Sequence, residues 1–183
     1  MTVGECKELI YMLLDEHSAG GEIEHDEDIE LKMIRFMDMG QKALSAIKPI
    51  IREYKVRRQE GKTLYAMPED FLKARAVWRD GKKHAGYPWR GKKIYIPERD
   101  RSEDIAVEYA AMPEQLTEDT DDEYELEIDE DAAQALPYFV CAQNLLPDIV
   151  VDWQPYWSMY QQMTAELGRS TTPVSIQQSF YRG

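Results

Sequence analysis

The chain has 183 residues, of which 22 are Lys or Arg and 35 are Asp or Glu, so its formal net charge is −13. This acidity argues against a protein that wraps nucleic acid or sits on an anionic membrane surface. A hydrophobic content of 43% excludes a wholly disordered chain, and no apolar run approaches a membrane span. No signal peptide is predicted and two cysteines provide no disulfide framework, so we expect a reducing cytoplasm.

Two helices are predicted before residue 55, because apolar residues there recur at spacings of three and four. The first covers residues 2–18. The second covers residues 29–54, roughly eight turns, and its apolar stripe includes Gly40, where we expect another helix to approach closely. Pro49 removes a backbone donor within this stripe, which predicts a kink there.

A small antiparallel β meander is predicted over residues 62–112, where the hydrophobic period changes to two. The dipeptide Asp80-Gly81 is suited to a tight hairpin turn within it. An acidic loop over residues 113–128 then leads back to helical sequence. The meander is therefore interpreted as an insertion in a helical protein.

Two further helices are expected after the acidic loop. Asp129 is predicted to cap a helix that continues to Leu146 through Pro137. Asp152 is predicted to cap the last helix, which Gly168 closes. The predicted fold class is mainly α.

In this prediction, residues 1–168 form a single four-helix bundle-like domain that carries the small β insertion. Residues 169–183 follow it as an extended C-terminal docking arm. A disordered terminus is the usual expectation for the end of a chain, but this arm keeps four apolar side chains, so a docking strand is at least as good a prediction. The candidate partner-binding residues of the arm are Val174, Ile176, Phe180 and Tyr181.

The sequence contains no recognisable constellation for catalysis or for binding a cofactor or metal. His17, His25 and His84 are isolated, and Cys6 and Cys141 lie on apolar stripes. No phosphate-binding loop, dinucleotide fingerprint or nucleophile elbow is present. We therefore predict a protein that is not an enzyme and needs no cofactor.

Charge is segregated along the chain. Basic residues crowd the meander, whereas the stretches 22–30 and 118–131 are acidic. Lysines on edge strands often serve only to discourage aggregation. The alternative is that a basic face of one subunit pairs with an acidic face of the next. The candidate partner-binding residues of the meander are Arg79, Lys82, Lys83 and Arg90.

Short motifs follow the two N-terminal helices in a characteristic order. They are Leu64-Tyr65-Ala66-Met67-Pro68-Glu69-Asp70-Phe71, then Lys93-Ile94-Tyr95-Ile96-Pro97, then the stretches 105–113, 116–121 and 128–136, and finally a tyrosine-rich helix. Over residues 5–168 this order resembles the head–tail adaptor (connector) proteins of tailed bacteriophages. The resemblance rests on the order of elements and on short phrases, not on a catalytic signature.

The resemblance implies a ring, usually a dodecamer, that binds the portal protein and offers a docking surface to the next neck or tail protein. Its partners would be the portal and neighbouring subunits, with DNA only passing through the lumen and no membrane involved. We expect the virion neck as its location, and the host cytoplasm during assembly. Two alternatives remain: a neck protein that hydrolyses peptidoglycan with a carboxylate pair within residues 118–131, and an acidic mimic of DNA.

Overall fold

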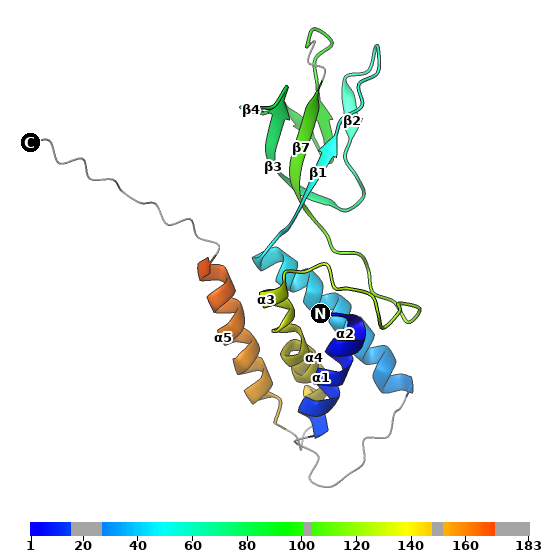
Figure 1. Ribbon diagram of the computed structural model, residues 1–183, viewed down its shortest axis with the longest axis vertical. Coiled ribbons are helices and arrows are strands. Elements are labelled where there is room, and N and C mark those ends of the chain that lie inside the picture. Colours follow the sequence, from blue (N-terminus) through cyan, green and yellow to red (C-terminus); the bar gives the residue numbers. More distant parts are fainter. Residues whose placement is uncertain (16–26, 101–103, 148–151, 171–183) are drawn as a thin grey trace, which may run out of the picture.

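Helices and strands occupy separate parts of the molecule, as Figure 1 shows. The computed structural model describes residues 1–15, 27–100, 104–147 and 152–170. The strands all lie between the second and third helices, and we call residues 50–111 the β module. The described residues of 1–47 and 112–170 form the helical module. The prediction of a mainly α fold is wrong, because two antiparallel sheets make this an α+β fold.

The helices and strands of the two modules have the following bounds. The helices are α1 (Val3–Asp15), α2 (Glu27–Ile47), α3 (Glu130–Ala133), α4 (Leu136–Leu145) and α5 (Gln154–Ser170). The strands are β1 (Ile50–Lys55), β2 (Leu64–Ala66), β3 (Phe71–Arg79), β4 (Lys82–His84), β5 (Trp89–Arg90), β6 (Lys93–Tyr95) and β7 (Ile105–Ala111).

The second predicted helix is shorter than its apolar stripe indicated. It ends at Ile47, and the expected kink is instead the boundary between α2 and β1. Pro49 accounts for the break, since it lacks a backbone donor and disfavours helical conformation in the residue before it. Beyond it, side chains alternate between half-buried and exposed, as in a strand with one covered face. Ile51, assigned to the helical stripe, is 44% exposed.

The β module contains two antiparallel sheets that enclose one apolar core. One sheet has the strand order β1-β7-β3-β4 and the other β2-β6-β5. The predicted turn at Asp80-Gly81 is confirmed: both residues have positive φ, 46° and 74°, and Arg79 pairs with Lys82 across the hairpin. The buried side chains of this core are Val56, Tyr65, Met67, Phe71, Val77, Tyr87, Ile94, Ile96, Ile105, Val107, Tyr109 and Ala111.

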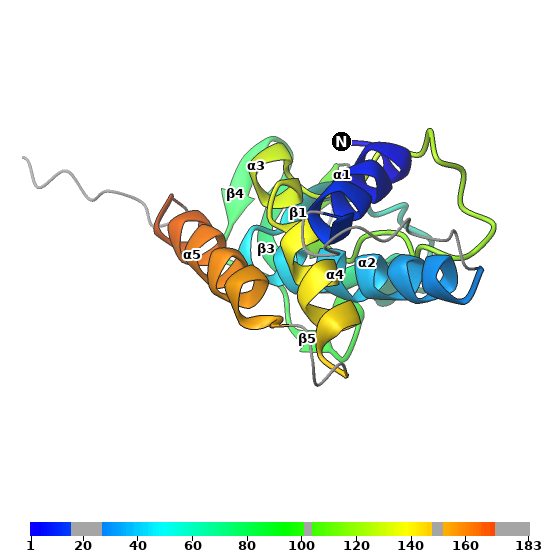
Figure 2. The same cartoon turned by 90° about the horizontal axis from the view of Figure 1, so that it is seen from below.

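Helix α4 is the centre of the helical module and contacts α1, α2 and α5 (Figure 2). Leu136, Val140 and Cys141 have no exposed surface, as expected of a helix that is apolar on all sides. Gly40 in α2 faces this helix: a Cβ atom added there would lie 2.8 Å from Cδ1 of Phe139 and against Leu136 as well. The predicted close approach of a second helix at Gly40 is therefore confirmed.

The predicted helix 129–146 consists of two helices. Asp129 caps α3, because its carboxylate accepts a hydrogen bond from the Asp131 N–H at 3.0 Å. Pro137 lies in the first turn of α4, where its missing N–H is tolerated, so it begins a helix rather than interrupting one. Asp152 accepts from the Gln154 N–H at 3.0 Å, but it lies one residue before the N-cap position of α5, and the helix continues past Gly168 to Ser170.

The acidic loop, residues 113–128, packs against α1 and contributes to the core of the helical module. The Val3 N–H donates to the Tyr124 carbonyl at 2.9 Å, and the Gly4 N–H donates to the Asp122 carbonyl at 2.8 Å. Leu126 is buried in the helical core, and Lys7 forms an ion pair with Asp122 at 2.6 Å. These contacts place the first turn of α1 beside the acidic loop.

Candidate interaction surfaces

Charged side chains join the β module to the helical module. Arg52 in β1 lies 2.5 Å from the Asp70 carboxylate, and its other terminal nitrogen binds Glu127 in the acidic loop. The Tyr109 hydroxyl donates to Asp70 at 3.1 Å, and burial together with that carboxylate raises the pKa of Tyr109. Glu127 also accepts from the Glu114 N–H at 2.7 Å. This arrangement is a structural junction between modules.

A second junction fixes the end of α2 against the start of α3. Lys48 binds the Asp129 carboxylate and lies 3.3 Å from Asp131. The hydrogen bond between Lys48 and Asp129 raises the pKa of the lysine and lowers that of the aspartate. Both junctions use charged groups in ion pairs within the chain, so these groups are not available to a partner.

The described residues bring no metal-binding cluster together. No cluster of three or more His, Cys, Asp or Glu side chains suited to a metal ion occurs among them. Burial raises the pKa of both Cys6 and Cys141 to about 12, so neither is a thiolate nucleophile at neutral pH. His84 stacks on the Tyr87 ring with centroids 4.7 Å apart. His17 and His25 lie outside the described residues.

The basic candidates of the β module differ in how far their own chain already uses them. Arg79 lies 3.7 Å from Asp100, and the Arg90 guanidinium lies 5.9 Å from the Tyr95 ring centroid. Lys82 and Lys83 are exposed on β4, an edge strand, and neither takes part in an ion pair among the described residues. We call the segment 78–83 the basic hairpin, and its two lysines are its available cations.

Net charge has opposite signs in the two parts of the chain. Residues 50–111 contain 15 Lys and Arg against 10 Asp and Glu, a net charge of +5. The rest of the chain contains 7 against 25, a net charge of −18. Folding keeps this separation, because the β module and the helical module lie at opposite ends of the molecule (Figure 1). The chain therefore combines a β module of net positive charge with a remainder of net negative charge.

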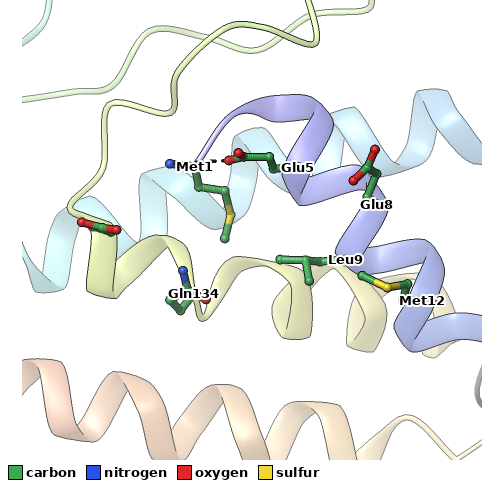
Figure 3. A pocket seen from close by; sticks show the side chains of 7 residues that line it. Met1, Glu5, Glu8, Leu9, Met12 and Gln134 are labelled. Atoms are coloured by element: carbon green, nitrogen blue, oxygen red, sulfur yellow. Dashed lines mark ion pairs between the residues drawn. The ribbon is translucent and has the colours of Figure 1, made fainter.

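The helical module has a groove between α1 and α3, shown in Figure 3. It has a volume of about 340 Å³. Its lining combines three carboxylates with apolar side chains: Met1, Glu5, Glu8, Leu9, Met12, Glu130 and Gln134. We call it the α1–α3 groove. Among the described residues no lysine or arginine lines it, and the Met1 ammonium lies 4.0 Å from Glu5.

A second groove of about 360 Å³ lies between α3 and α5 and shares Gln134 with the first. Asp131 and Glu166 line it together with Met163 and Leu167, so it is also acidic and apolar. Sequence reasoning named neither groove. The available signal was in α1, where Glu5, Glu8, Leu9 and Met12 stand at helical spacings of three and four and so share one face.

The four candidate residues of the C-terminal arm lie outside the described residues, so the prediction for them stands as made. They are Val174, Ile176, Phe180 and Tyr181.

Among the described helices, none is both long enough and apolar enough to cross a membrane. No protein-family model matches the chain, and no curated protein matches it.

Proposed function

We propose that this protein is a structural head–tail adaptor of a tailed bacteriophage. Its copies form a ring, usually a dodecamer in the proteins it resembles, that binds the portal protein and receives the next neck or tail protein. The proposal places the chain in the virion neck, and in the host cytoplasm during assembly. It assigns the chain no enzymatic activity.

The observation that carries this proposal is the opposite charge of the two modules. Electrostatic complementarity between surfaces guides association and sets the register of partners. A chain with a net +5 module and a −18 remainder can offer one surface to each of two neighbours. A repeated head-to-tail contact of that kind generates a ring when its rotation closes.

Two further features support a structural role over a catalytic one. The charged cluster around Arg52 joins the two modules, and the one around Lys48 fixes the end of α2 against the start of α3. The order of short motifs from Leu64 to the tyrosine-rich α5 resembles adaptor proteins. The acidic excess also suits a conduit through which DNA slides, since a negative wall repels the phosphate backbone.

Electron microscopy of the purified chain mixed with the portal protein of the same phage tests the proposal. We expect an added ring at one end of the portal, on the symmetry axis, that is missing from portal particles alone. Portal particles that stay unchanged at a large molar excess of the chain would contradict it. A zymogram tests the hydrolase alternative: an adaptor clears no peptidoglycan, whereas a clearing band would favour the enzyme.

A further inference from the structure

The α1–α3 groove offers a partner both apolar surface and uncompensated negative charge. Met12 is 56% exposed at its edge. Glu8 and Glu130 are exposed, and neither forms an ion pair among the described residues. Glu5 differs, because it accepts from the Thr2 N–H at 2.8 Å, caps its own helix and lies 4.0 Å from the Met1 ammonium. The groove therefore suits a group that is apolar along its length and positive at its end.

The basic hairpin carries side chains with these properties. Lys82 and Lys83 have long aliphatic stems, which can lie on methionine while the ammonium group meets a carboxylate. Lys83 stands directly across from Trp78 in the β3–β4 pairing, and Trp78 is only half-buried. Tryptophan is among the residues that contribute most to protein interfaces. One face of the hairpin thus combines the aromatic anchor Trp78 with the cation Lys83, whereas Lys82 projects from the opposite face beside Arg79.

The hairpin cannot reach the groove of its own chain. β4 belongs to the β module, whereas the groove lies beside α1 in the helical module, at the other end of the molecule (Figure 1). We propose that the basic hairpin of one copy docks in the α1–α3 groove of a second copy. Lys83 then faces the carboxylates of Glu8 and Glu130, and Trp78, on the same face of the hairpin, lies against Met12.

This inference rests on the proposed ring and identifies the contact between its neighbours. The two surfaces are different patches of one chain, so the contact is heterologous and leaves one free hairpin and one free groove on each dimer. Further copies can add at both ends until the ring closes. A symmetric dimer that uses both contacts at once would stop at two copies.

Site-directed cross-linking tests the contact. The variant with Lys83→Cys and Glu8→Cys, treated with a short bismaleimide with and without portal, should form covalent dimers, trimers and larger species. The native Cys6 and Cys141 are buried and do not compete for the reagent. The control variant replaces Lys83→Cys with Lys55→Cys on β1, the opposite edge of the same sheet. No more product from the first variant than from the control, in both conditions, would overturn the inference.

Neutralising each surface provides a second test, read by sedimentation at low salt. The hairpin variant Lys82→Ala/Lys83→Ala and the groove variant Glu8→Gln/Glu130→Gln should each self-associate about tenfold more weakly than the unaltered chain. An equimolar mixture should recover a one-to-one dimer that does not grow, because only one intact pair remains. A mixture no more associated than its components, or growth of the mixture beyond a dimer, would overturn the head-to-tail contact.

These results are separable from the test of the adaptor function. Rings on the portal without hairpin-to-groove cross-links would refute the contact and leave the function standing. Cross-linked oligomers that never attach to portal would support the contact and refute the function.

Discussion

Replacing Gly40 tests whether the close approach of α2 and α4 holds the helical core together. A Cβ atom at this position would lie 2.8 Å from Cδ1 of Phe139 and closer still to Leu136. Both side chains are buried, with exposed fractions of 8% and 0%, so neither has open space into which to move. Gly40→Ala must therefore push the two helices apart or force a side chain from its preferred rotamer.

Two opposing terms set the size of the effect. Alanine is favoured over glycine in a helix interior by about 1 kcal/mol. Overpacking of a tight core costs about 1–3 kcal/mol. At Gly40 the packing term is the larger, and we expect a net loss of about 1 kcal/mol in the free energy of unfolding. Gly40→Leu should lose more, since it inserts three further carbon atoms at the same contact.

Gly168 provides a matched control in α5, because no atom outside its own stretch of helix lies within 4 Å of the position its Cβ would take. Gly168→Ala should be stabilising by up to about 1 kcal/mol. For a chain of this size, 1 kcal/mol corresponds to about 2–4 °C in Tm, so the two variants should differ by about 4–8 °C. Thermal unfolding followed by circular dichroism measures this. If both substitutions raise Tm, the packing argument at Gly40 is refuted.

Three other predictions concern the α3 cap, the cysteines and the C-terminal arm. Asp129→Ala should lower the free energy of unfolding by about 1 kcal/mol at neutral pH in urea denaturation. The hydrogen bond with Lys48 lowers the pKa of Asp129 in the folded chain below 3.8. The Asp129 carboxylate therefore stabilises the fold above pH 3.8, and this stabilisation is lost as the pH falls through the lowered pKa. The two proteins should converge in stability as the pH falls below 3.8, and a constant difference would refute this role. Burial raises the pKa of Cys6 and Cys141 to about 12, so both thiols should resist maleimide in the folded chain at pH 7 and react once urea unfolds it. Fast labelling of the folded chain would contradict their burial. Truncation after Gly168 should leave Tm nearly unchanged while abolishing portal attachment, and full attachment of the truncated chain would show that the arm is dispensable.

The features that depend on neighbouring residues can be predicted from the sequence alone. The helical repeat of α1, the Asp129 cap and the apolar face of α5 follow from residues three or four positions apart, because a helix makes its hydrogen bonds within one turn. The Asp80-Gly81 turn was equally predictable, since only a few residue types accept positive φ at both positions.

The boundary between α2 and β1 could not be predicted in the same way. Ile47, Ile51 and Tyr54 continue the helical spacing of three and four, so the apolar pattern alone favoured one long helix. The strand forms because its backbone pairs with β7, from Ile50 opposite Ala111 to Lys55 opposite Ala106. That pairing outweighs the local pattern and gives the α+β fold.

Charge segregation was visible along the sequence, but the surfaces that use it were not. The α1–α3 groove exists only where Glu8 and Met12 meet Glu130, which lies far along the chain. Whether a basic residue is available to a partner also depends on residues far along the chain. Arg79 forms an ion pair with Asp100, whereas Lys83 forms none among the described residues. Local hydrogen bonding determines helices and turns, whereas grooves and free charges depend on which distant residues the fold brings together.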